Sequence, residues 1–351
     1  MSNYPSDLHR TTFDTPTTNA TAWLDATLDS VVPVKCHSHN DYWREYPLFS
    51  GLAAGCTGTE ADVYLSENGQ DLLVGHDLAS ISPEKTLRSM YLDPLFEMLQ
   101  HRNSENASSS ENDQAKGVYI TSSLEPLILL IDVKEKPDII WPMVIRQLES
   151  FRRSQFLTRY EVLPGASKPG RIVPGPLTVV GSGDLHLEQL VSAYDVAGAP
   201  GNGGFHVYHD TFLDAPLADL DVQGSGDYQS TNSYYVSSSF KATIGQVRFG
   251  FSHCQMEKLR DQVRAAKDRG LVIRYWAVPG WPLNYRDYIW RTLRGEGVEV
   301  LNVDEVKEVS ARWTSGYLKS VVAMIVISGC AVLFFTMGAF FHYRRVRTAV
   351  L

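Results

Sequence analysis

Residues 31–77 read VVPVKCHSHNDYWREYPLFSGLAAGCTGTEADVYLSENGQDLLVGHD and contain two extended runs separated by a helical segment. The runs are 31–37 and 57–65, and the helical segment is 47–55. Residues 70–77 follow the turn Glu67-Asn68-Gly69, so we expect them to form a hairpin with the second run. Strand, helix and strand in this order predict parallel strands covered by helices.

The same alternation continues to residue 310 and defines the expected architecture. Extended runs are expected at 31–37, 57–65, 127–134, 177–183, 205–210, about 238–243, 271–278 and 298–304. Helices are expected at 47–55, 141–154, 186–197, 256–269 and 285–295. Strands that alternate with helices in this way predict an α/β fold, a TIM (β/α)8-type barrel over residues 31–310.

The composition is that of a globular domain and argues against nucleic acid as a partner. The 351 residues are 44% hydrophobic and 21% charged, with a formal net charge of −8. An acidic chain is poorly suited to neutralising a phosphate backbone. The polar run 101–117 lacks apolar periodicity, so it is expected to be a surface insertion in the barrel.

The two ends of the chain are expected to lie outside the barrel. Residues 1–30 form an N-terminal extension. Residues 321–341 are apolar or small and carry no charge, which predicts a transmembrane helix. A juxtamembrane linker at 311–320 precedes it, and a short basic tail at 342–351 follows. The sequence therefore predicts a single-pass membrane protein.

The orientation of the expected membrane protein follows from its basic tail. Arginines after the apolar run favour a cytosolic tail and a lumenal or extracellular catalytic domain, although 1–30 lack the apolar core of a signal peptide. Sequons at Asn19 and Asn106 permit a lumenal domain. Cys36 and Cys56 could form a disulfide if the domain faces an oxidising compartment.

Titratable side chains recur where the expected strands end. Glu60 and Asp62 point to one side of their strand, because side chains alternate across a strand, and Asp132 lies on the neighbouring strand. The carboxyl ends of barrel strands meet on one face, so these three carboxylates are expected to hold a divalent cation, Mg²⁺ or Ca²⁺. Lys134, two residues beyond Asp132, is expected to bind a phosphate oxygen.

The motifs in this first third of the chain resemble those of a known superfamily. A strand-end histidine, Glu60-x-Asp62, His76-Asp77 after a hairpin and Asp132-Val133-Lys134 look like the opening of the phosphatidylinositol-specific phospholipase C and glycerophosphodiester phosphodiesterase superfamily. They are similar, more narrowly, to its fungal branch, the altered inheritance of mitochondria protein 6 family. Two later features, Trp276 and the run 297–306, also resemble features of this superfamily.

The resemblance implies a metal-dependent phosphoric diester hydrolase or lyase that acts on a glycerophosphodiester or lysophospholipid-like substrate. A histidine pair would serve as acid and base. The usual His-Arg-Gly is replaced by His37-Ser38-His39, and both histidines remain candidates beside His76. His37 matches by strand position, whereas His39 with Asn40 matches the spacing of shorter relatives. Trp276 is a candidate for substrate binding, and packing is its alternative role.

Two other interpretations remain open. One is a catalytically inactive barrel that serves as a membrane-tethered binding or scaffold protein, an interpretation favoured by the loss of His-Arg-Gly. The other is a metal-dependent hydrolase of a different ester on a barrel of convergent design. The three carboxylates favour the phosphodiesterase over the inactive barrel. A convergent hydrolase would share the carboxylates but is not expected to share the His76-Asp77 hairpin.

Overall fold

The fold is taken from a computed structural model, which describes residues 20–104, 114–162, 170–198, 204–221, 228–306 and 309. The chain divides into two compact units, Met1–Val306 and Lys307–Leu351. The expected fold and the candidate site residues belong to the first unit.

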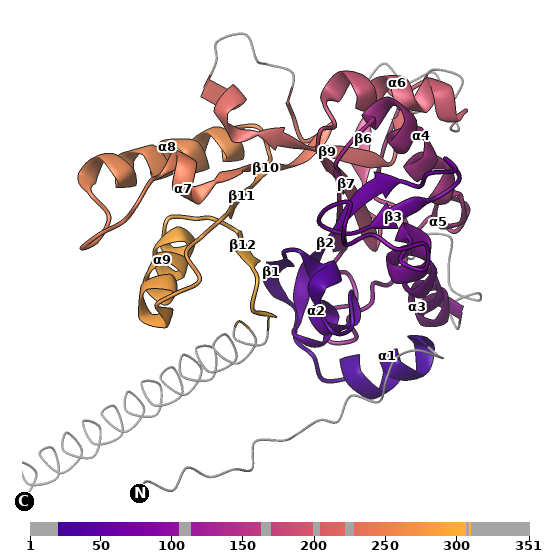
Figure 1. The fold of residues 1–351 in the computed structure, drawn as a ribbon, viewed down its shortest axis with the longest axis horizontal. Coiled ribbons are helices and arrows are strands. Elements are labelled where there is room, and N and C mark those ends of the chain that lie inside the picture. The colour runs from indigo at the N-terminus through magenta and orange to yellow at the C-terminus, as the bar shows by residue number, and fades with distance from the viewer. Residues whose placement is uncertain are drawn as a thin grey trace, which may run out of the picture. The chain divides into compact units, whose positions relative to one another are not determined.

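The described strands form a parallel barrel, and this confirms the expected α/β fold (Figure 1). Its strands run in the order β1, β2, β4, β7, β9, β10, β11 and β12, and β12 pairs with β1 to close the barrel. Their bounds are Val34–Ser38, Cys56–Leu65, Leu127–Val133, Leu177–Gly183, Thr211–Pro216, Ser233–Ser239, Val272–Trp276 and Val300–Val303.

Strand β4 shows how the apolar runs build the barrel. Its sequence LILLIDV is apolar on both faces, as a parallel strand covered by helices requires. Ile128 and Leu130 pack inside the barrel with Val180, Tyr235 and Val300, whereas the alternate residues pack outside against the helices. Asp132 has the parity of the inward-facing residues and lies at the end of the strand.

Helices cover the barrel on more than one side, with α8 and α9 lying apart from α4 and α6 (Figure 1). Helix α8 begins at a capping box in which Ser252 accepts from the Gln255 N–H, and α6 ends at Gly198 with φ 64°. The helix bounds are Ala20–Leu28 (α1), Phe49–Ala53 (α2), Asp93–Ser104 (α3), Pro137–Gln147 (α4), Glu149–Arg153 (α5), Leu187–Ala197 (α6), Phe240–Thr243 (α7), His253–Asp268 (α8) and Leu283–Gly295 (α9).

The expected hairpin after the second strand is confirmed. Strand β3 (Leu72–Val74) pairs antiparallel with β2, Val63 opposite Val74. A small second sheet joins β5 (Arg159–Glu161), β6 (Arg171–Val173) and β8 (Tyr208–His209), all antiparallel. Residues 101–104 of the expected insertion continue helix α3, and 105–113 lie outside the described residues.

The fifth and sixth expected strands are misplaced. The run 205–210 contributes only β8 to the small sheet, and the barrel strand is the following segment, TFLDAP. Asp214 and Pro216 lower the strand propensity of that segment, but burial inside the barrel overrides propensity. The sixth strand begins at Ser233 rather than near Ser238, and helix α7 takes 240–243.

The expected single-pass membrane localisation is corrected. Within the described ranges no helix is long and apolar enough to cross a bilayer. A membrane span needs roughly 20 apolar residues, whereas the longest helix with stated bounds, α8, has 16 residues and carries many charges. The apolar run 321–341, the linker 311–320 and the tail 342–351 lie outside the described residues.

Cys36 and Cys56 form a disulfide between β1 and β2, with their Cα atoms 4.7 Å apart. The bond joins the two neighbouring strands that carry His37 and Glu60. It therefore ties the strand that carries Glu60 and Asp62 to the strand that leads into His39.

Candidate active site at the carboxyl ends of the barrel strands

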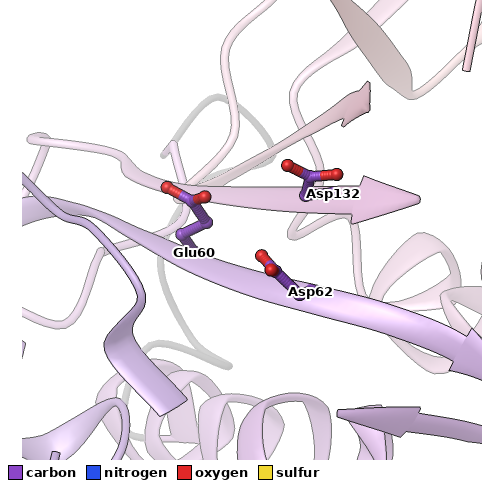
Figure 2. Close-up of side chains that lie close together, drawn as sticks. All are labelled: Glu60, Asp62 and Asp132. Carbon is purple, nitrogen blue, oxygen red and sulfur yellow. The ribbon is translucent and has the colours of Figure 1, made fainter. Parts of the chain in front are cut away.

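Three carboxylates converge inside the barrel near the carboxyl ends of β2 and β4 (Figure 2). Glu60 and Asp62 come from β2, and Asp132 lies directly opposite Asp62 on β4. One oxygen from each residue lies within 4.8 Å of those of the other two. The three residues expected from the sequence to bind a cation are thus brought together.

Two cationic side chains neutralise part of this charge. The Nζ of Lys134 lies 2.8 Å from Asp62 Oδ2 and 3.1 Å from Asp132 Oδ2. The guanidinium of Arg274, on β11, lies 3.3 Å from Glu60 Oε2 and 3.0 Å from Asp214 Oδ2, on β9. Arg274 and Asp214 are buried inside the barrel.

His39 and His76 border the carboxylates from two different loops. His39 Nε2 lies 4.0 Å from Glu60 Oε1, and its Nδ1 lies 2.7 Å from Asp304 Oδ1. His76 Nδ1 lies 3.7 Å from Asp62 Oδ2, and its ring packs against the ring of Trp43. His39 is partly exposed and His76 about half exposed, so solvent and solutes can reach both imidazoles.

His37 is placed differently from the other two candidate histidines. Its side chain is fully buried, with Nε2 3.3 Å from Glu60 Oε2 and its ring edge-on to Tyr235. The ring fits there because residue 58 is glycine: a Cβ at Gly58 would lie 2.4 Å from His37 Nδ1. His37 therefore packs beneath Glu60, away from the barrel mouth.

The environments of the histidines move their pKa values in opposite directions. Burial and the nearby Arg274 lower the pKa of His37 to about 4, so His37 is neutral near pH 7. Burial opposes the charged form of His39 too, but the hydrogen bond to Asp304 and the charge of Glu60 outweigh it and raise its pKa. His39 is thus the better suited of the two to hold a proton near neutral pH.

The carboxylates also differ in pKa. Burial would raise the pKa of Glu60, but contacts with His37 and Arg274 outweigh burial and hold it below its usual range. Burial raises the pKa of Asp132 to about 6, with Lys134 offsetting part of the effect. Burial and the charge of Glu60 raise the pKa of Asp62. Glu60 is therefore ionised, whereas burial and the neighbouring carboxylates both disfavour the ionised forms of Asp62 and Asp132.

These residues fit a divalent cation. Asp62 Oδ1 and Asp132 Oδ1 are buried and accept no hydrogen bond from any described residue, while Lys134 binds only the Oδ2 atoms. A buried carboxylate oxygen without a partner is costly, and a hard cation would satisfy both. Glu60, Asp62 and Asp132 are the residues that would hold it.

Comparisons with known proteins show the family to which this chain belongs. A model of the AIM6-like phosphodiesterase domain matches residues 25–196, which include Glu60, Asp62 and Asp132. An altered inheritance of mitochondria protein 6 homolog of Arthroderma benhamiae is 36% identical over 286 residues, 79% of this chain and 82% of that protein. The chain belongs to the altered inheritance of mitochondria protein 6 family. The family member from Eremothecium gossypii is 32% identical over 293 residues, 81% of this chain and 70% of its own.

In this member of the altered inheritance of mitochondria protein 6 family, the candidate residues do not all meet. The three carboxylates, Lys134, His39 and His76 border one another. His37 lies beneath them, and Trp276 lies at the end of β11 with 43% of its surface exposed. Trp276 follows Arg274 by two residues, so its side chain leaves the same face of the strand nearer the mouth.

Several polar residues of the site were missed in the sequence. Arg274 interrupts the apolar run LVIRYWAV, a signal that marks a buried charge. Asp304 directly follows the last strand and could have been found in the same way as the other strand-end residues. Asp214 lies on the misplaced fifth strand. Tyr42, whose hydroxyl donates to Asp62 Oδ2 at 2.8 Å, had no motif to mark it.

Proposed function

We propose that this chain is a cation-dependent phosphoric diester hydrolase or lyase with its active site at the barrel mouth. The observation that carries the proposal is the pair of accessible imidazoles, His39 and His76, each about 4 Å from a carboxylate of the cluster. The match to a model described as an AIM6-like phosphodiesterase domain supports the reaction class.

The proposed chemistry divides between the two histidines and the cation. A divalent cation on Glu60, Asp62 and Asp132 would balance negative charge on the phosphate. His39, with its raised pKa and its hydrogen bond to Asp304, would donate a proton to the leaving alkoxide. His76 would accept a proton from the attacking group. The attacking group is water in a hydrolase and a hydroxyl of the substrate itself in a lyase.

We infer a glycerophosphodiester or lysophospholipid-like substrate. Trp43 packs on His76 and is 61% exposed, and Trp276 is also exposed, so aromatic surface borders the imidazoles. Exposed aromatic surface beside a charged centre suits a substrate with one ionic and one less polar part.

The test is turnover of glycerophosphodiesters and lysophospholipids by the full chain, with Mg²⁺, Ca²⁺ or a chelator. Glu60→Gln and His76→Gln are the test variants. His206→Gln is the matched control because His206 is exposed and its ring packs against Phe205 rather than against a site residue. We expect turnover that the chelator stops, that both test variants lose by at least about a hundredfold, and that His206→Gln retains. A cyclic phosphate product would identify a lyase.

The same experiment separates the enzyme from an inactive barrel. Lys134 and Arg274 already pair with all three carboxylates, which is the feature that an inactive binding protein would share. Cation binding without turnover of any substrate in the panel would favour that second function. Turnover that Glu60→Gln leaves unchanged would place the active site elsewhere.

A further inference from the structure

The barrel interior contains two ion-paired groups that meet at the proposed cation site. In the first, Lys134 lies between Asp62 and Asp132. In the second, Arg274 lies between Glu60 and Asp214. Each group has two carboxylates and one cationic side chain, so each is left with one negative charge when its members are ionised. A single divalent cation would neutralise the two groups together.

Asp214 belongs to this arrangement although it is not one of the clustered ligand candidates. It lies behind Arg274, on β9, where Ser182 donates to Oδ2 at 3.2 Å. Its Oδ1 is buried without a hydrogen-bond partner among the described residues. Barrel interiors are usually filled with branched apolar side chains, and a buried ion pair is seldom more stable than such packing. A charged Asp214 therefore needs a reason beyond stability.

The contacts of Arg274 supply that reason. Its Nε donates to Ser237 Oγ at 3.0 Å, and Nη1 donates to Asn302 Oδ1 at 3.0 Å and to Glu60 Oε2 at 3.3 Å. Nη2 donates to Asp214 Oδ2 at 3.0 Å, which is shorter than the contact with Glu60. Arg274 is buried, and its guanidinium donates hydrogen bonds to four side chains inside the barrel. It is therefore held in place rather than free to bind a substrate.

We propose that Asp214 is a positioning residue for the cation site: it holds and balances the Arg274 guanidinium, and so leaves the charge of Glu60 available to a divalent cation. This inference rests on the proposed function, because it assumes that a cation binds Glu60, Asp62 and Asp132. Without the charge of Asp214, Arg274 neutralises Glu60, and the two groups together keep one negative charge instead of two. A divalent cation is then attracted less strongly.

The test is a calorimetric titration of the full chain with Mg²⁺ and with Ca²⁺, which measures the affinity for each cation. Asp214→Asn is expected to weaken binding about tenfold or more, since outer residues that tune a metal site commonly change affinity by that much. Adding Arg274→Met to Asp214→Asn restores two negative charges and is expected to recover most of the lost affinity. A residue that merely stabilised the barrel would not show this recovery, because the second substitution removes another buried contact.

The matched control is Asp210→Asn. Asp210 is buried and forms an ion pair with Arg152 at 2.6 Å, as Asp214 does with Arg274. The partners of Asp210 lie outside the cation site. The Asp210→Asn variant is expected to unfold more easily than the wild type but to bind both cations with the wild-type affinity. If Asp214→Asn does not fold, Arg274→Met alone decides, since it is expected to bind at least as tightly as the wild type, and weaker binding would overturn the inference.

The outcomes separate failure of this inference from failure of the proposed cation-dependent function. A wild type that binds neither cation would refute the cation-dependent function and this inference with it. A wild type that binds, together with an Asp214→Asn variant that binds equally well, would refute the inference alone. A double variant as weak as Asp214→Asn would also refute it, because charge balance would not then be the cause.

Discussion

His39 and Asp304 are joined by a 2.7 Å contact between Nδ1 and Oδ1, although 265 residues separate them in the chain. The closure of the barrel through β1 and β12 brings them together, because His39 follows β1 and Asp304 follows β12. Asp304 fixes the Nδ1 side of the ring, so Nε2 is the nitrogen that points towards Glu60. An imidazole oriented in this way resembles the histidines of many acid–base sites.

The first prediction concerns this pair. Asp304→Asn should lower the pKa of His39, because a neutral amide no longer favours the imidazolium, while burial still opposes it. The measurement is an NMR titration of the His39 ring, with Asp77→Asn as control, since Asp77 caps its own turn at Ser80. Once a substrate is known, turnover should begin to fall at a lower pH than in the wild type, because the protonated form of His39 is lost at a lower pH. An unshifted His39 titration would contradict the role given to Asp304.

The second prediction separates the two neighbouring histidines. His39→Gln should reduce turnover about 10²- to 10⁴-fold with little change in stability, as for loss of a general acid or base. His37→Gln should chiefly lower the melting temperature, because His37 is fully buried against Glu60 and Tyr235. Thermal melts and rates on the same samples give both quantities. A His37 variant that is as stable as the wild type but inactive would reverse the assignment.

The third prediction is a pH effect on stability in chelator. Asp132 has a pKa of about 6 when folded, against 3.8 ordinarily, so the folded state binds its proton more tightly than the unfolded state. Ionised Asp132 thus destabilises the fold above pH 6, and this penalty disappears as the pH falls towards 4. Asp132→Asn should therefore be more stable than the wild type at pH 7.5, by roughly 3 kcal/mol, and the difference should shrink at pH 4.5.

Urea denaturation with chelator at the two pH values measures this difference. Saturating Mg²⁺ or Ca²⁺ should invert the order at pH 7.5, because the wild type gains binding energy that the variant lacks. An Asp132→Asn variant that is less stable than the wild type in chelator at pH 7.5 would show that ionised Asp132 does not destabilise the fold.

The fourth prediction concerns the Cys36–Cys56 disulfide. It joins residues 20 apart in sequence. Replacing both cysteines with alanine should lower the free energy of unfolding by about 3 kcal/mol under oxidising conditions, from the entropy of a loop of this length. Cys254→Ala is the control because Cys254 is a free, exposed cysteine. Equal stability of the double variant and the wild type would show that the bond contributes nothing to the fold.

The carboxylate cluster could be predicted from the sequence because its geometry is local. Glu60 and Asp62 share a face through the two-residue period of a strand, and Asp132 faces Asp62 because β2 and β4 are neighbours in the barrel. The hairpin that carries His76 was equally visible from its Asn-Gly turn. The fifth strand was misplaced because Asp214 and Pro216 resemble loop residues until the barrel buries them.

The sequence alone determined the barrel, the three clustered carboxylates and the family, since strand–helix alternation and short motifs are properties of neighbouring residues. Only the tertiary structure decided which histidine is accessible, because His37 and His39 differ in burial rather than in sequence pattern. It also decided which charges balance the site. Arg274 contacts Glu60 from 214 residues away, a distance along the chain that only barrel closure can bridge.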